Sequence, residues 1–324
     1  MVLPVLSVSV HINYHIPLLW ALCAFILLSG CTPKNPLPSD NTTVSSHIKV
    51  PFVTPRSELC GATSIEMLAS YWQSTTPYTP RLSADELDDR TLIPEKGGTL
   101  QAELVATARA NGLLAHRLQP TFNALFSELK AQHPVIVLVN RGYTWYPLWH
   151  YAPVTGYDAK NKTVLMHFSD QANEAIPVET FGALWERSGH WGVVLLPPNT
   201  LPASASAKNF LRSAYALEKT RMIDDAITAY QAGLKRWPKD TDILFALSNA
   251  YYASHRLKKA EQGYRKLLAL EPGHPLALNN LADLLCHTGR ANSALRLIKK
   301  AKTDDREIQS IIKATRKEIL NGCS

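Results

Sequence analysis

One cysteine of this 324-residue chain stands where a helix is expected to begin. After Cys60-Gly61, the apolar side chains Ile65, Leu68 and Trp72 recur at spacings of three and four residues, which is typical of an amphipathic helix. Cys60 would lie in the first turn, where unpaired backbone N–H groups and the helix dipole favour a thiolate. Cys60 is therefore the candidate nucleophile, and we expect its pKa to lie below the ordinary value of about 8.5.

A cysteine nucleophile needs a base and a group that orients the base. His150 opens a β-like run after a turn-rich segment, and Asp170 ends the next apolar run, where it would hold the imidazole tautomer. Asn140, at the end of an upstream strand, is a candidate wall residue. The simpler alternatives are a buried structural Cys60, an Asp170 that only forms a turn, and another histidine as the base. Those histidines are His116, His133, His190 and His167, the last of which we expect to be structural.

These residues resemble the motifs of papain-like cysteine peptidases of the bacteriocin-processing, double-glycine type. The first motif of that family is Cys-Gly at the start of a helix, as in Cys60-Gly61. The second is a His followed by apolar residues and Gly-Tyr-Asp, as in His150 and Gly156-Tyr157-Asp158, and the third is an Asp about twenty residues beyond, here Asp170. The resemblance implies that Cys60 attacks a peptide carbonyl, that His150 acts as base and then acid, and that Asp170 orients the ring.

One position departs from this family. A glutamine five or six residues before the cysteine usually donates a hydrogen bond to the oxyanion, and this chain has Thr54 and Pro55 there. Losing such a donor typically costs about 100- to 1,000-fold in rate. Two other functions therefore stay open beside a peptidase: a catalytically weak or silent peptidase-like domain that binds a peptide segment, and a repeat-based assembly scaffold.

The order of patterns along residues 50–198 predicts an α+β domain with helices packed on an antiparallel sheet. Helical patterns come first, from Cys60 onward and then over residues 83–89, 100–111 and 122–130. Strand patterns follow over residues 134–140, 151–158, 163–168 and 191–196. This is the order that a papain-like fold requires.

Residues 1–30 resemble a lipoprotein signal peptide. The apolar run over residues 16–30 is too short to span a bilayer comfortably, and it ends at Cys31 in a sequence that resembles a lipobox, whose cysteine is acylated. Residues 31–49 are rich in Pro, Ser, Thr and Asn and predict a flexible tether. Because Thr32 rather than an Asp follows, analogy with the usual sorting rule predicts a lipid-anchored protein of a bacterial outer membrane that faces the periplasm. The alternatives are an ordinary signal peptide and a short membrane anchor.

The chain repeats beyond a linker at residues 199–206. Small, aromatic and proline residues recur with a period of 34 (260 − 226 and 294 − 260), namely Ala226, Ala260 and Ala294, Tyr230 and Tyr264, and Pro238 and Pro272. This pattern resembles the tetratricopeptide repeat. Residues 207–324 would form an all-α domain of about three units with a capping helix over residues 307–320. The groove of such a stack usually binds a peptide or helix of a protein partner.

Composition narrows the remaining possibilities. The formal charge of +7 comes without a basic stretch interleaved with aromatics, so we expect no nucleic-acid partner. No cluster has zinc spacing and no Gly-rich loop indicates a nucleotide, so we expect no cofactor and no metal. The expected partners are a peptide or protein substrate, a protein in the repeat groove, and the membrane through lipid on Cys31. Cys286 and Cys323 could pair in an oxidising periplasm.

Overall fold

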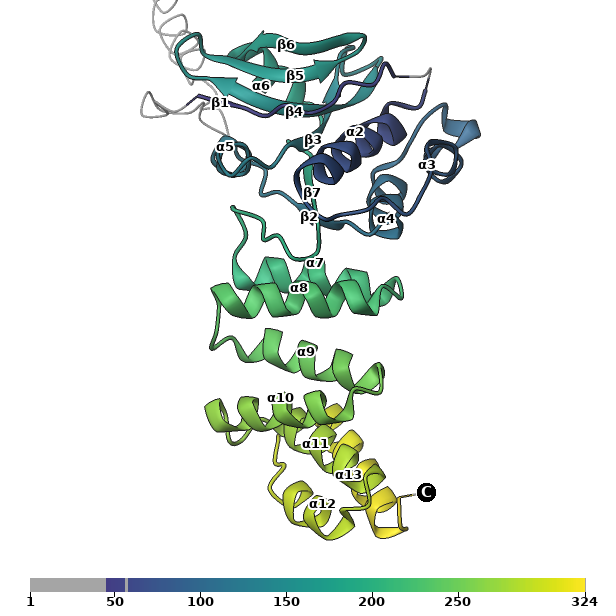
Figure 1. Ribbon diagram of the computed structural model, residues 1–324, viewed down its shortest axis with the longest axis vertical. Coiled ribbons are helices and arrows are strands. Elements are labelled where there is room, and N and C mark those ends of the chain that lie inside the picture. Colours follow the sequence, from purple (N-terminus) through teal and green to yellow (C-terminus); the bar gives the residue numbers. More distant parts are fainter. Residues whose placement is uncertain (1–44, 56–57, 324) are drawn as a thin grey trace, which may run out of the picture.

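The computed structural model describes residues 45–55 and 58–323. An α+β unit lies at one end of the long axis, and a stack of helices extends from it toward the C-terminus (Figure 1). Over this part of the chain, we find no helix with both the length and the apolarity to cross a bilayer. The expected signal peptide and the expected lipidation site, Cys31, lie outside the described residues.

The first unit is built on one antiparallel sheet, with strands in the order β2-β7-β3-β4-β5-β6 and with β1 paired to the second half of β4. Strands β3 and β7 are buried along their whole length, which explains their continuous apolar sequences. The strand bounds are β1 (Ser46–His47), β2 (Leu114–Arg117), β3 (Val135–Asn140), β4 (Trp149–Asp158), β5 (Thr163–Phe168), β6 (Gln171–Pro177) and β7 (Gly192–Leu196).

Helix α2 (Cys60–Thr75) packs on this sheet, and the Trp72 indole N–H donates a 2.7 Å hydrogen bond to the Leu195 carbonyl in β7. The apolar stripe expected from Ile65, Leu68 and Trp72 is buried there. The other helices of the unit are α3 (Ala84–Thr91), the short 3-10 helix η1 (Pro94–Lys96), α4 (Gln101–Ala110), α5 (Phe122–Lys130) and α6 (Val178–Glu186). The predicted α+β class is confirmed.

The structure adds three strands, the α-helix α6 and the 3-10 helix η1, which the sequence patterns did not predict. Strand β1 is two residues long and β2 is four, too short for a periodic pattern. Strand β6 forms the outer edge of the sheet, and its mostly exposed Gln171–Pro177 lacks the apolar alternation of a half-buried strand. Helix α6 follows β6 without a loop, so no turn residues separate the two elements.

The Gly156-Tyr157-Asp158 segment serves the sheet itself. A Cβ at position 156 would lie 2.2 Å from the Ser46 carbonyl oxygen, so only glycine lets β1 pair with β4 there. The Tyr157 ring packs 4.4 Å from that of Phe126, and Asp158 accepts two backbone N–H bonds in the turn that follows. These residues position the strand that carries His150.

The second unit is all helical, and its predicted repeat architecture is confirmed. The helices are α7 (Ala207–Lys219), α8 (Ile223–Arg236), α9 (Thr241–Ala253), α10 (Leu257–Leu270), α11 (Pro275–His287), α12 (Ala291–Ile298) and α13 (Arg306–Leu320). Ala226, Ala260 and Ala294 are fully buried, each in the second helix of a pair. Only a small side chain allows the helices to approach so closely at these positions.

Polar contacts join the repeats to the α+β unit. His116 of β2 shares a buried 2.9 Å hydrogen bond with Ser213 of α7. Near the surface, Arg81 donates two hydrogen bonds to the Asp225 carboxylate, at 2.6 and 2.8 Å. His116 therefore belongs to this junction and is excluded as the catalytic base.

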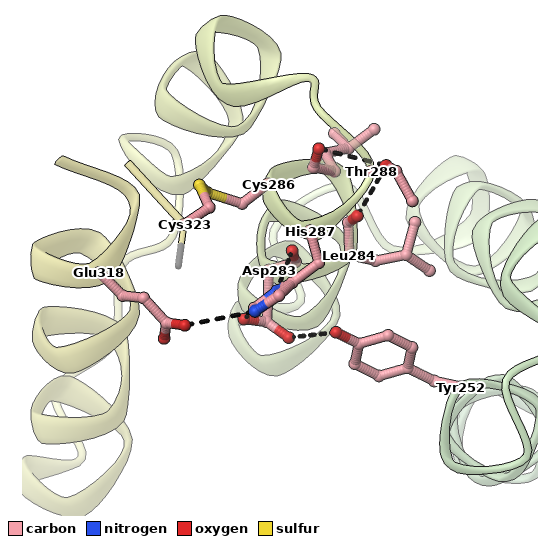
Figure 2. The surroundings of a disulfide bond; sticks show 9 residues. Tyr252, Asp283, Leu284, Cys286, His287, Thr288, Glu318 and Cys323 are labelled. Atoms are coloured by element: carbon pink, nitrogen blue, oxygen red, sulfur yellow. Dashed lines mark hydrogen bonds and ion pairs between the residues drawn. A yellow bond between two sulfur atoms is a disulfide. The ribbon is translucent and has the colours of Figure 1, made fainter. Parts of the chain in front are cut away.

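A disulfide between Cys286 of α11 and Cys323 closes the far end of the stack, with Cα atoms 5.6 Å apart (Figure 2). Beside it, the His287 ring lies between Asp283, at 3.5 Å, and Glu318 of α13, at 3.4 Å. The pairing considered from the sequence is present, and it ties the capping helix to the last repeat.

Candidate active site

Cys60 begins helix α2 and is the free cysteine of the described residues. No side chain caps this helix end and its first turn has no acidic residue, so the thiol meets backbone N–H groups. The Tyr151 N–H of β4 donates a 3.5 Å hydrogen bond to Cys60 Sγ. The backbone N–H groups of Cys60 and Gly61 also interact with the sulfur and favour its thiolate form. Strand β4 thus places a donor on the thiol from the residue directly after His150.

Burial raises the pKa of the Cys60 thiol, and the three backbone N–H groups oppose this effect without reversing it. Our expectation of a lowered pKa is therefore wrong for the free protein, because desolvation outweighs the helix terminus. The thiol is protonated at neutral pH.

His150 is half-buried on β4, and its ring packs edge-on against Phe168, 5.5 Å away. Its Nε2 accepts a 3.4 Å hydrogen bond from the Ser169 N–H. The Arg141 guanidinium packs over the same Phe168 ring, 4.9 Å from its centre. Burial and then the Arg141 charge lower the pKa of His150 to about 4, so the imidazole is neutral at pH 7.

Asp170 lies in the turn between β5 and β6 and is exposed. The residue before it, Ser169, has a positive φ of 58° and turns its N–H toward the His150 ring. The contact recorded at Nε2 therefore comes from the backbone beside Asp170 rather than from its carboxylate. The orienting role of Asp170 stays a prediction.

Cys60 and His150 line one cleft of about 1090 Å³. Next to Cys60, position 61 requires a glycine, because a Cβ there would lie 2.7 Å from Oγ1 of Thr99, which lines the cleft. That hydroxyl is buried, and it finds no hydrogen-bond partner within the described ranges. Of the two residues in place of the family glutamine, Pro55 lines the cleft and Thr54 is exposed to solvent.

Two parts of the chain match families of known proteins. Residues 46–193 match the model described as "Peptidase_C39 like family". We call the first unit, which contains these residues, the C39-like domain. Residues 211–275 and 245–307 match the tetratricopeptide repeat, and the helical pairs of the second unit agree with that match.

Individual relatives match the two parts separately. A TPR repeat-containing protein of Pseudomonas aeruginosa is 34% identical over 93 residues, which cover 28% of this chain and 16% of that protein. A C39-like peptidase of Bacillus anthracis is 17% identical with a TM-score of 0.38, over 47% of this chain and 98% of that chain. The TPR2B domain of yeast Sti1, in a complex with pHsp70, is 18% identical with a TM-score of 0.33, over 36% and 96%.

Two other histidines of the C39-like domain have structural partners. His167 Nε2 lies 3.0 Å from the Val50 carbonyl, and its Nδ1 accepts from the Asn173 N–H at 3.1 Å. His133 is paired with Glu128 at 2.7 Å. The structural role expected for His167 agrees with these contacts.

Two groups near Cys60 and His150 were not predicted from the sequence. Thr99 follows a Gly97-Gly98 pair that indicated only a turn, and no sequence signal marks a buried hydroxyl. The Ser169 N–H is a backbone group, whose direction depends on the left-handed conformation of that residue. Asn140 lies at the base of the connection that leads to His150, where its side chain holds the loop.

Proposed function

We propose that the chain is a cysteine peptidase in which Cys60 and His150 of the C39-like domain cleave a peptide bond. The observation that carries this proposal is the position of Cys60 at the start of α2. The Tyr151 N–H donates a hydrogen bond to its sulfur, and His150 lines the same cleft. A thiol, an imidazole and backbone N–H donors in one cleft are the parts that acyl transfer needs.

The reaction begins with a neutral pair. When a peptide carbonyl enters the cleft, Cys60 Sγ forms a bond to the carbonyl carbon while the thiol proton passes to His150. His150 then gives that proton to the leaving amine as the C–N bond breaks. Water then attacks the thioester carbonyl and gives a proton to His150. As the C–S bond breaks, His150 returns this proton to sulfur, which releases the carboxylic acid product and restores the thiol. The oxyanion would accept from the Cys60 N–H, with the Thr99 hydroxyl as a second available donor.

Asp170 would act by replacing the Ser169 N–H at His150 Nε2. A carboxylate there would accept the Nε2 proton, leave the Nδ1 lone pair free for the thiol and raise the His150 pKa. The two residues are adjacent, so a change confined to one exposed turn would exchange them. Apo active sites often tighten in this way when substrate binds.

A second candidate is a domain that binds a peptide without cleaving it. The hydrogen bond from Ser169 to Nε2 favours it, because the neutral ring then carries its proton on Nδ1 and offers the thiol no free lone pair. The position of Thr54 and Pro55 in place of a glutamine favours it as well.

Turnover separates the two candidates. The purified chain is incubated with unfolded casein, and new peptides are followed by mass spectrometry for the wild type, Cys60→Ala and His150→Ala. We expect cleavage by the wild type alone. If all three proteins release the same peptides at the same rate, Cys60 and His150 do not catalyse the cleavage and the peptidase proposal fails. If none cleaves casein and all bind it equally, the binding candidate replaces the peptidase proposal.

We further propose that the repeats bind a protein partner in their groove and that lipid on Cys31 anchors the chain to an outer membrane, facing the periplasm. The helical pairs support the first statement and the sequence before residue 32 supports the second. Cys31→Ser should move the protein from the membrane fraction to the soluble fraction. An unchanged membrane fraction would refute the anchor.

A further inference from the structure

The connection between β3 and β4 exposes a cluster of large apolar side chains. We name it the aromatic hairpin, and its members are Tyr143, Trp145, Tyr146, Leu148 and Trp149. They make up five of the ten most exposed large apolar side chains in the described part of the chain, with exposed fractions from 50% to 81%. A contiguous exposed apolar patch of this kind often marks a binding site, whereas single exposed apolar residues are common on any protein surface.

The aromatic hairpin is rigid although it is exposed. The buried Asn140 amide oxygen accepts from the Gly142 and Leu148 N–H groups, both at 2.9 Å. Arg187, the C-cap residue of α6, donates to the Gly142 carbonyl at 2.7 Å and to the Asn140 carbonyl at 3.2 Å. A Cβ on Gly142 would lie 2.3 Å from the Tyr146 carbonyl oxygen, so the tight turn depends on this glycine.

Its rings are also held in place before any partner arrives. Tyr143 stacks on Trp145 with 5.5 Å between ring centres and 8° between ring planes. A surface that is ordered in advance loses less conformational entropy when it binds, so its apolar area contributes more fully to affinity. The buried Asn140 amide and the Arg187 side chain thus hold the hairpin in a conformation that exposes its aromatic rings to solvent.

The aromatic hairpin continues into the cleft of the candidate active site. Leu148 and Trp149 line the cleft beside Cys60 and His150. A separate wall segment, at the start of α4, adds Leu100, which is 48% exposed. Apolar groups from two segments of the chain therefore flank the thiol.

We infer that the aromatic hairpin and Leu100 bind an extended peptide segment with large apolar side chains next to the bond that Cys60 attacks. This inference rests on the proposed function, of which it names the substrate class. A peptide is favoured over a lipid surface because Leu148, Trp149 and Leu100 lie in the walls of the cleft, where a strand-like chain can enter. Alternate side chains of such a chain would meet the two apolar walls.

Binding without turnover tests the inference. The full chain carries Cys31→Ser, which removes any acyl chain, and Cys60→Ala, which removes the nucleophile. Short fluorescent peptides of Gly and Ser hold either a central Leu-Phe pair or a central Asn-Ser pair, and affinity is read from anisotropy. The test variant adds Trp145→Ser and Trp149→Ser, and the matched control adds Ile311→Ser, an exposed apolar residue of α13. Thermal melting verifies that each variant is folded.

We expect the Leu-Phe peptide to bind at least about tenfold more tightly than the Asn-Ser peptide, with this preference lost in the double Trp variant and kept in the control. Equal affinities, or an unchanged preference without the two tryptophans, would overturn the inference. Trp-dependent sedimentation with vesicles of phosphatidylethanolamine and phosphatidylglycerol, without a peptide preference, would overturn it in favour of a lipid surface.

The two levels of the proposal can fail separately. If the chain with Cys60 restored cleaves no peptide while the Trp-dependent preference persists, the peptidase function fails and the apolar peptide site stands. If it cleaves both peptides equally and the double Trp variant does the same, the peptidase function stands and the aromatic hairpin has no part in substrate choice.

Discussion

The backbone N–H of Ser169 donates to Nε2 of His150 over 3.4 Å, at the position where a carboxylate would be needed to make the ring a base toward Cys60. While this hydrogen bond is present, the neutral ring carries its proton on Nδ1, and its lone pair at Nε2 is occupied. In the proposed reaction, the exposed neighbour of Ser169, Asp170, has to take this place at Nε2.

Asp170→Asn should lower kcat by at least about tenfold, because an amide cannot stabilise the imidazolium that forms during attack. The melting temperature should stay the same, since Asp170 is an exposed turn residue that asparagine suits equally well. Glu179→Gln, an exposed carboxylate of α6, is the matched control. Wild-type kcat in Asp170→Asn would show that Asp170 only forms the turn.

The stability of the protein should depend on His150 between pH 6.5 and pH 4. The folded state holds the His150 pKa at about 4, so as the pH falls below 6.5 the unfolded state binds a proton first and stability is lost. The loss is at most about 3 kcal/mol, and solvent around the half-buried ring reduces it. Urea midpoints measured from pH 7 to pH 4.5 should fall less steeply for His150→Gln than for the wild type. Parallel curves would contradict the low pKa.

Arg141 lowers the His150 pKa through its charge, so removing that charge should raise it. NMR titration of the His150 ring protons should give a higher midpoint in Arg141→Gln than in the wild type. Arg141→Lys, which keeps the charge, is the control and should stay near the wild-type midpoint. An unchanged midpoint in both variants would mean that burial alone sets the value.

Ala260 of α10 is fully buried between packed helices, so a larger side chain should force them apart. Ala260→Leu should destabilise the protein by about 1–3 kcal/mol. Lys258→Leu places the same side chain at an exposed position of the same helix and should have little effect. The comparison of the two melting temperatures tests the assigned repeat register, which would be wrong if both variants melted alike.

The bond between Cys286 and Cys323, 37 residues apart, should stabilise the protein by about 2–4 kcal/mol. Dithiothreitol should therefore lower the melting temperature of the wild type. A variant with both cysteines changed to serine should melt at the lower temperature with or without the reductant. A wild type that is insensitive to the reductant, with the bond shown to be broken, would mean that α13 packs independently of it.

Sequence alone was sufficient where one periodic signal dominates. The stripe of Ile65, Leu68 and Trp72 predicted α2, and the alanines at 34-residue spacing predicted the helical pairs. It was insufficient where structure depends on a distant partner. Strand β6 is polar because it lies at a sheet edge, so it pairs without leaving an apolar pattern.

The candidate site was predicted in part for the same reason. Cys60 and His150 were expected to lie close together from their sequence motifs, and both line one cleft. The thiol pKa was not predictable, because burial comes from tertiary packing whereas the helix terminus is visible in the sequence. For residues 141–149, the sequence indicated only a turn-rich segment. No local pattern reveals that the Asn140 side chain holds this segment in place through hydrogen bonds to its backbone.

The junction at His116 and Ser213 and the disulfide at Cys286 have a joint consequence for how the repeats open. Stacked repeats ordinarily fray from their terminal helices, where each unit has a neighbour on one side only. Here α7 docks on the C39-like domain and α13 is covalently held, so both terminal helices are restrained. Amide exchange in the stack should therefore be slowest at its ends and fastest near its middle, which is the reverse of the profile of a free solenoid.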